Sequence, residues 1–320
     1  MRRRFCRNLE ILLITPLGRL FFKMQYDKDE VMIYNNGKYE KEQIPAEKWM
    51  RLIYGNSAGL APLLFLIKRK VLSRIYGAYC RTEHSAKKIP EFIKKYNIDM
   101  NGHSGSYKSF AEFFARAKDK DSVFFPSEPE VLGSPCEGVL SAYVDIDPQK
   151  TISAKGSHFS LAELFADEDM AKAYEGGTMI KIRLVPSDYH RAHFFDDGVV
   201  TDSKLVNGAL LSVNPLAVRS MARLYCVNKR AVVSFSSKNF GDVVFVEVGA
   251  TFVGSIVHSF EVGKPVERGQ EAGYFLPGGS LIMMFFKKGE VVPGEEFLKQ
   301  TEAGFETRVR LGDAIGRAGM

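Results

Sequence analysis

A change of pattern near residue 120 limits the folds that are open to this chain. Before it, apolar residues recur with helical spacing in "PAEKWMRLIYG", "IPEFIKKYNI" and "SFAEFFARAK", where Ser109 and Glu112 have the spacing of a capping box. After it come short β-branched or aromatic segments bounded by Gly, Pro, Asn or Asp: "VLSAYVDID", "MIKIRLV", "AVVSFSS", "DVVFVEVGATFVGSIV" and "LIMMFF". This order predicts an α+β fold, with helices in residues 1–118 followed by a mainly antiparallel β-sheet core in residues 119–320.

The composition is that of an ordinary folded protein. The 320 residues are 45% apolar and 26% charged, with a net charge of +6, so the chain can bury a large core. We find no internal repeat, P-loop or Rossmann fingerprint, and the small positive excess predicts no nucleic-acid partner. Because the cysteines are far apart and form no CxxC pair, we expect free thiols in a reducing compartment: Cys6, Cys80, Cys136 and Cys226.

Two apolar segments near the start of the chain bear on membrane contact. Residues 1–22 begin like a signal peptide, but a glutamate, a proline and an arginine interrupt the apolar run. In residues 58–77 a second run is too short to span a bilayer before it meets the basic cluster at 68–70. This segment is either a helix in the membrane interface, with its basic residues at anionic headgroups, or a buried helix with a solvated basic end.

The stretch "LVPSDYHRAHFFDDG" contains two histidines, His190 and His193, three residues apart. A metal site would need a third ligand from Asp188, Asp196 or Asp197, and no zinc-type spacing supports one, so we predict no metal. Imidazole suits general acid–base chemistry better, because it takes and returns protons near neutral pH. The alternative is a pair of loop histidines without a chemical role.

Two further stretches offer a carboxylate and a hydroxyl. In "LGSPCEGVLSAYVDI", Glu137 is either a solvated turn residue or the group that orients a histidine. In "YFLPGGSLIMMFF", Gly278, Gly279 and Ser280 most simply form a turn before a strand. Ser280 is a weak nucleophile unless a base activates it. Carboxylate, histidine and serine together make a triad set, whose geometry only a structure can supply.

These three stretches, in this order, resemble the phosphatidylserine decarboxylase family of pyruvoyl enzymes. "SPCEG" at 134–138 is similar to the family's Ser-Pro-x-Asp-Gly turn, and "PSDYHRAH" at 186–193 to its Pro-x-Asp-Tyr-His-Arg-x-His motif. "GGS" at 278–280 is similar to its Gly-Ser self-cleavage site. The resemblance runs from about residue 45 to the end and includes "SFAEFFAR", "LLSVNPLAV", "VEVGATFVGSI" and "GFETRVRLGDAIG".

The resemblance implies that the chain cuts itself between Gly279 and Ser280. The products would be a β chain of residues 1–279 and an α chain of residues 280–320. Ser280 would become a covalent pyruvoyl group, which draws electrons from the carbon that loses CO2, as pyridoxal phosphate does elsewhere.

The resemblance also implies roles for the other site residues. His193 would be the base for self-cleavage, oriented by Glu137, and His190 would assist decarboxylation or reprotonation. This sequence departs from the family's pattern at two positions. The turn aspartate is Glu137, one methylene longer, and the hydroxyl residue after the serine is Leu281. If the family's hydroxyl assists proton transfer, Leu281 would slow or prevent self-cleavage.

The substrate implied is phosphatidylserine in an anionic membrane, and the product is phosphatidylethanolamine. A lipid substrate favours the interfacial interpretation of residues 58–77 and predicts peripheral attachment to the cytoplasmic face of the cell membrane. A homo-oligomer is left open. The alternatives are a pyruvoyl decarboxylase of a free amino acid and a non-cleaving, membrane-binding relative without activity. A serine hydrolase is disfavoured, because Ser280 lacks a G-x-S-x-G context.

Overall fold

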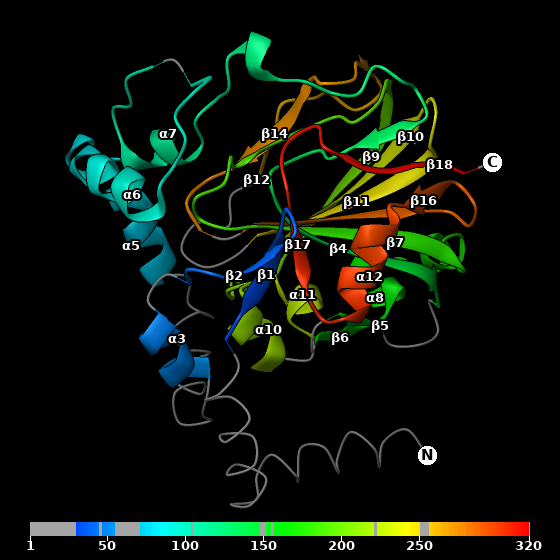
Figure 1. The fold of residues 1–320 in the computed structure, drawn as a ribbon, viewed down its shortest axis with the longest axis horizontal. Helices are drawn as coiled ribbons and strands as arrows, with labels where there is room; N and C mark the ends of the chain where they lie inside the picture. Colours follow the sequence, from blue (N-terminus) through cyan, green and yellow to red (C-terminus); the bar gives the residue numbers. More distant parts are fainter. Residues whose placement is uncertain are drawn as a thin grey trace, which may run out of the picture.

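A ten-stranded sheet forms the centre of the molecule (Figure 1). The structure is a computed structural model, which describes residues 30–44, 47–54, 71–103, 105–147, 152–154, 157–220, 223–249, 256–278 and 280–319. The order of the strands in the sheet is β13 (Pro265–Val266), β9 (Gly198–Val206), β10 (Arg230–Ser237), β11 (Gly241–Gly249), β15 (Ser280–Phe286), β7 (Gly177–Leu184), β4 (Gly138–Ile146), β17 (Glu306–Val309), β1 (Met32–Asn35) and β2 (Lys38–Lys41).

The predicted α+β class is confirmed. The five strand segments predicted from the sequence correspond to β4, β7, β10, β15 and the pair of β11 with β12 (Ile256–His258). All pairs described in the large sheet are antiparallel except β1 with β17, which are parallel. The three predicted helical segments correspond to α3 (Glu47–Tyr54), α6 (Ile89–Tyr96) and α7 (Phe110–Phe114).

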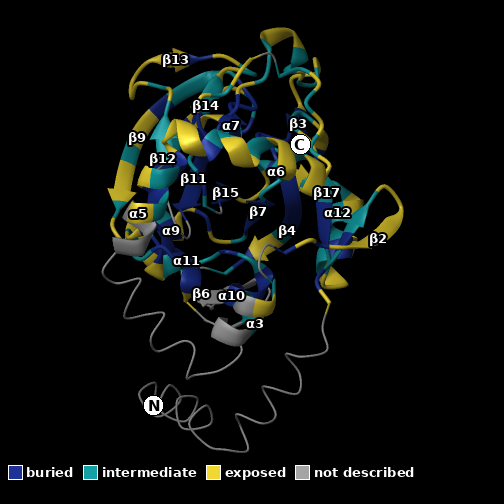
Figure 2. Cartoon of the chain, turned by 90° about the vertical axis from the view of Figure 1, so that its left-hand side faces the viewer, coloured by how far each residue is buried: buried dark blue, intermediate teal, exposed yellow. Residues whose placement is uncertain are grey.

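Strand β15 is buried along its whole length, because both faces of the sheet are covered (Figure 2). Its odd-numbered residues pack in one apolar cluster with α8 (Leu161–Phe165), α9 (Glu168–Lys172), α10 (Pro215–Ser220) and α11 (Leu224–Val227). Its even-numbered apolar residues pack in a second cluster, against two three-stranded sheets and α12 (Glu295–Glu302). This two-sided burial explains why "LIMMFF" is a continuous apolar run without alternation.

The two small sheets cover the face toward which the even-numbered residues of β15 point. One contains β12, β14 (Glu271–Phe275) and β8 (Arg191–His193), and the other contains β16 (Val291–Pro293), β18 (Ala314–Ala318) and β3 (Val131–Gly133). A separate hairpin pairs β5 (Ile152–Ala154) with β6 (Ser157–Phe159). The sheet of β8 and β14 matters most for function, because it holds the histidine motif.

Helices α5 (Val71–Cys80), α6 and α7 form a group at one side of the sheets, together with the 3₁₀ helix η1 (Glu83–Lys88) (Figure 1). They share an apolar cluster of their own. The capping-box prediction holds at Ser109, whose hydroxyl accepts the N–H of Glu112 at 3.3 Å. Most of the expected interfacial segment, residues 58–70, lies outside the described residues. No helix in the described part of the chain is both long and apolar enough to cross a membrane.

The region before residue 118 is not wholly helical, since β1 and β2 form a hairpin that joins the large sheet. Its turn is Asn36-Gly37, with φ angles of 44° and 84°, which suits the left-handed positions of a tight hairpin turn. Strand β1 pairs with β17 near the other end of the chain. The division of the chain at residues 118 and 119 stays a prediction.

Candidate active site

Ser280 is the first residue of the central strand β15, where it pairs with Gly249 of β11 and Leu184 of β7. Its side chain is fully buried, and its Oγ makes no hydrogen bond to any described residue. Gly279, on the other side of the predicted scissile bond, lies outside the described residues. A buried hydroxyl without a partner costs free energy, and the hydroxyls of Ser141 and Thr307 share this feature with Ser280. What distinguishes Ser280 is its place directly after Gly279 at the start of β15.

The side chain of Leu281 points to the opposite face of the sheet from Ser280, because successive residues of a strand alternate. It is fully buried in the apolar cluster formed with α8–α11, and it pairs with Val248 and Arg183. A hydroxyl at position 281 would therefore enter the core on the far face. We therefore expect the departure from the family's pattern at this position to affect packing.

His190 lies at the end of the turn that follows β7. Its Nδ1 is 2.9 Å from the backbone oxygen of Asp188. Because a carbonyl oxygen only accepts, Nδ1 carries the proton, and Nε2 holds a lone pair. This Nε2 is buried and has no partner in the described residues. The ring of Phe114 lies 3.9 Å away, centroid to centroid, and burial lowers the pKa of His190 to about 3. At neutral pH His190 is a neutral base with a free lone pair.

His193 is also buried, but both of its ring nitrogens are occupied. Nδ1 donates to the backbone oxygen of Gly269 at 2.8 Å, which leaves the lone pair on Nε2. The hydroxyl of Tyr189 donates to this Nε2 at 2.9 Å. Burial lowers the pKa of His193 below its ordinary value. His193 therefore becomes available as a base only when the hydroxyl of Tyr189 releases it.

Glu137 lies in the turn before β4 and contacts neither histidine. Its Oε1 pairs with Nζ of Lys118 at 2.8 Å, and its Oε2 accepts the backbone N–H of Tyr189 at 3.2 Å. Tyr189 connects Glu137 to His193, because its backbone bonds to the first and its side chain to the second. The backbone N–H of His193 also donates to the oxygen of Pro135 in the same turn, at 2.8 Å. The orienting role of Glu137 stays a prediction.

Asp188 holds the backbone of the turn between β7 and His190. Its Oδ2 accepts the N–H of Val185 at 2.7 Å, and its Oδ1 bonds Nη1 of Arg308 at 2.7 Å. Burial raises the pKa of Asp188 to about 6, against the opposing effect of Arg308. The sequence suggested Asp188 only as a metal ligand. Within the described residues, no three His, Cys, Asp or Glu side chains gather so that they could hold a metal ion.

Sequence reasoning missed Arg116, which supports the same turn from the N-terminal side. Its Nη2 donates to the backbone oxygens of Ser187 and Asp188, at 3.0 and 3.2 Å. The signal was present as the last residue of "SFAEFFAR", which resembles a family segment, but nothing in that segment indicates which backbone the guanidinium contacts.

Two chain connections bring His190 to the segment that leads into Ser280. The turn that carries His190 starts at Leu184, which pairs with Ser280, and the backbone oxygen of His190 accepts the N–H of Phe275 at 2.9 Å. Phe275 ends β14, directly before the connection to β15. This part of the fold therefore combines a hydroxyl that can lose a proton with a neutral imidazole that can take one.

Comparison with known proteins gives the family of this chain. A family model described as "Phosphatidylserine decarboxylase" matches residues 110–317. The phosphatidylserine decarboxylase proenzyme of Clostridium novyi is 40% identical over 281 residues, which cover 87% of this chain and 95% of that protein. Those of Clostridium kluyveri and Ruminiclostridium cellulolyticum are each 41% identical, over 87% and 89% of this chain and 95% and 97% of their own lengths. The chain belongs to the phosphatidylserine decarboxylase family of carboxy-lyases.

Proposed function

We propose that this protein converts phosphatidylserine to phosphatidylethanolamine, with a pyruvoyl group that it makes from Ser280. The observation that carries the proposal is the buried hydroxyl of Ser280, which has no partner in the described residues and begins the central strand. The similar proteins are named proenzymes, which indicates that processing precedes activity in them. A serine with a free hydroxyl, directly after a glycine, is what self-processing at this bond requires.

The cleavage steps balance with one water as the added reactant. A base takes the Oγ proton of Ser280, Oγ bonds to the carbonyl carbon of Gly279, and the C–N bond breaks as its nitrogen takes a proton. Elimination across Cα and Cβ of Ser280 breaks the Cβ–Oγ bond of this ester and leaves residues 1–279 with a terminal carboxylate. The remaining enamine adds water and loses ammonia, so that residues 280–320 begin with a pyruvoyl group. This group supplies an electron sink for decarboxylation.

We propose different tasks for the two histidines, on the basis of their lone pairs. His190 is neutral, buried and unpartnered at Nε2, so it is suited to move a proton at the reacting carbon of the substrate. His193 would serve as the base for cleavage, with Glu137 supporting the segment through Tyr189. The hydroxyl of Tyr189 then has to release Nε2 of His193 before Ser280 reacts.

We also propose that the protein attaches peripherally to an anionic membrane, at the cytoplasmic face of the cell membrane. The substrate is a lipid, and the apolar and basic segment at residues 58–77 leads into α5. On α5 the apolar side chain of Ile75 is 62% exposed, as expected of a helix whose apolar surface meets lipid.

Intact mass spectrometry of the purified protein tests the proposal. We expect two chains, residues 1–279 and 280–320, with the smaller one blocked at its N-terminus and reactive toward carbonyl reagents. Ser280→Ala should give one uncut chain. Wild-type protein that remains uncut would overturn the proposal and favour a non-cleaving relative. Turnover of phosphatidylserine in vesicles, compared with free serine, separates a lipid enzyme from a decarboxylase of a free amino acid.

A further inference from the structure

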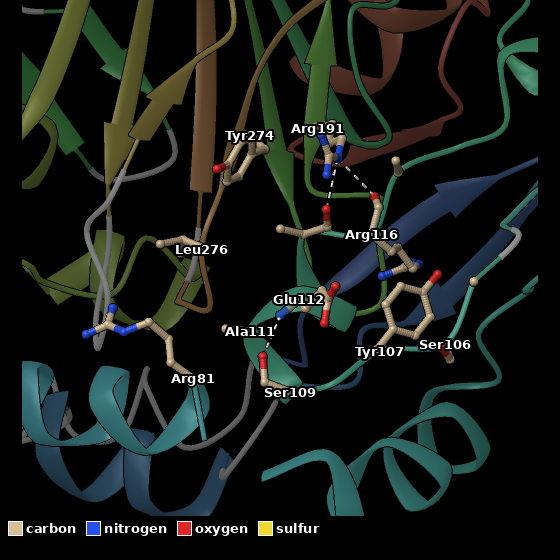
Figure 3. Close-up of a pocket in the computed structure, with 13 residues that line it drawn as sticks. Arg81, Ser106, Tyr107, Ser109, Ala111, Glu112, Arg116, Arg191, Tyr274 and Leu276 are labelled. Atoms are coloured by element: carbon tan, nitrogen blue, oxygen red, sulfur yellow. Dashed lines mark hydrogen bonds between the residues drawn. The ribbon is translucent and has the colours of Figure 1, made fainter. Parts of the chain in front are cut away.

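A cavity of ≈ 450 Å³ lies between the N-terminal helices and the sheet of β8 and β14 (Figure 3). One wall is formed by residues of the segment 105–117, and the other by Arg191 of β8 and Tyr274 of β14. Leu276, on the connection from β14 to β15, lines the cavity, as does Arg81 at the end of α5. The cavity therefore runs from the segment that leads to the candidate nucleophile toward the helices that precede the core.

Arg116 lines this cavity with donors that have no partner. Its side chain is only 3% exposed, and its Nη2 is used by the backbone oxygens of Ser187 and Asp188. Nε and Nη1 are buried and make no hydrogen bond to the described residues, while the ring of Phe113 lies 5.3 Å from the guanidinium carbon. A guanidinium stays charged in proteins, and leaving its donors unpaired inside the molecule is costly. Nε–H and Nη1–H point to opposite edges of the guanidinium, so an anion in the cavity would satisfy one of these donors.

The charges around the cavity favour an anion. Three arginines line it, against the single carboxylate of Glu112. Arg191 is already paired with Glu271, at 2.6 Å. The guanidinium of Arg81 makes no hydrogen bond or ion pair with the part of the chain that the structure describes. Arg81 and two nitrogens of Arg116 are thus free to bind an anion, and Figure 3 shows these two arginines on opposite sides of the space.

We propose that this cavity binds the phosphodiester of the substrate headgroup, with Arg116 as its main ligand and Arg81 as a second. The inference rests on the proposed function, which supplies a substrate with two anionic groups. The leaving carboxylate is a poor candidate, because an arginine would stabilise its charge before the reaction and lose that interaction as neutral CO2 forms. The phosphodiester keeps its charge throughout, and its oxygens can accept a charge-assisted hydrogen bond from a free guanidinium nitrogen.

Calorimetric titration of the Ser280→Ala chain tests this site without any catalysis. The probes are glycerophosphoserine, glycerophosphoethanolamine, L-serine and inorganic phosphate. We expect both phosphodiesters to bind, and L-serine and inorganic phosphate to bind at least tenfold more weakly, because each lacks part of the headgroup. Arg116→Lys should weaken phosphodiester binding by about 10- to 100-fold, since it removes the unpartnered Nε and Nη1 donors and keeps a charge.

Two further variants make the result independent of folding defects. Arg81→Gln changes a side chain without a described partner and should weaken binding by about 3- to 10-fold. Arg317→Gln, at an exposed position of β18, is the matched control without effect. Thermal unfolding verifies that Arg116→Lys is folded. If Arg116→Lys does not fold, the effect of Arg81→Gln on phosphodiester binding tests the proposal.

Three outcomes would overturn the proposal. Serine and glycerophosphoserine could bind through Arg116 while glycerophosphoethanolamine does not, which would assign the cavity to the carboxylate. Inorganic phosphate could bind as well as the diesters, which would make it a general anion site. The variants of Arg116 and Arg81 could bind as the Arg317 control does. Binding by the Ser280→Ala chain while wild-type protein stays uncut would refute the proposed function alone.

Discussion

Replacement of Leu281 by threonine separates packing from chemistry at the proposed cleavage site. The side chain of Leu281 is fully buried on the face of β15 opposite to Ser280. Threonine has one side-chain heavy atom fewer than leucine, which costs about 1 kcal/mol in lost burial. It also buries a hydroxyl among apolar side chains, which costs about 1–3 kcal/mol more if no acceptor is reached. We therefore expect Leu281→Thr to lose about 2–4 kcal/mol of unfolding free energy.

The matched control is Leu281→Val, because valine and threonine have the same shape. We expect Leu281→Val to lose about 1 kcal/mol, so that the difference between the variants isolates the hydroxyl. Urea unfolding is measured in the uncleavable Ser280→Ala chain, and the rate of cleavage is followed by denaturing gel in chains that retain Ser280. Cleavage should be equal within about twofold in both variants. Cleavage in Leu281→Thr at least tenfold faster than in Leu281→Val would refute the reasoning and give position 281 a chemical role.

Three further predictions address the site and the core. Tyr189→Phe removes the hydroxyl that is bonded to Nε2 of His193. Cleavage should therefore accelerate by about 5- to 10-fold, measured in a gel time course. An unchanged rate would show that His193 is not the base. Glu306→Gln removes the carboxylate that pairs with the buried Lys181, while Arg183 keeps its ion pair with Glu42, so we expect urea unfolding to show a loss of about 3–5 kcal/mol. A loss of less than about 1 kcal/mol would contradict this. Glu247 raises the pKa of His258 above 6.5, against the opposing effect of burial. The pair therefore stabilises the fold at lower pH, and this stabilisation is lost as pH rises through the raised pKa. His258→Gln should abolish that pH dependence of unfolding.

The sequence predicts the strands of the central sheet because these strands are buried and their residues are mostly apolar. β7 and β15 are buried at every position, and both appear as short β-branched or aromatic runs between turn residues. The hairpin at residues 32–41 was missed. Its second strand, β2, is exposed at all four positions and has no apolar alternation, although Asn36-Gly37 is a hairpin turn signal. Its partner β17 lies near the other end of the chain, beyond any local pattern.

The candidate site was predicted in its residue types but not in its hydrogen bonds. The motifs locate His190 and His193, yet the lone pair of each is fixed by a backbone oxygen, that of Asp188 for one and that of Gly269 for the other. Only the fold brings Gly269 to His193. The same limit applies to Arg116, whose free donors depend on a turn distant in the sequence. Periodicity carries no information about such contacts between distant segments.

The position of Ser280 at the start of β15 also bears on whether the two chains would stay folded together after cleavage. Strand β15 pairs with β11 on one side and β7 on the other through residues 280–286. The smaller chain would also contribute β17, whose Glu306 bonds the buried Lys181 and Arg183 of the larger chain. Breaking the bond before Ser280 removes none of these contacts. Cleavage would therefore release the new N-terminus for chemistry, while the central strand keeps both chains in one fold.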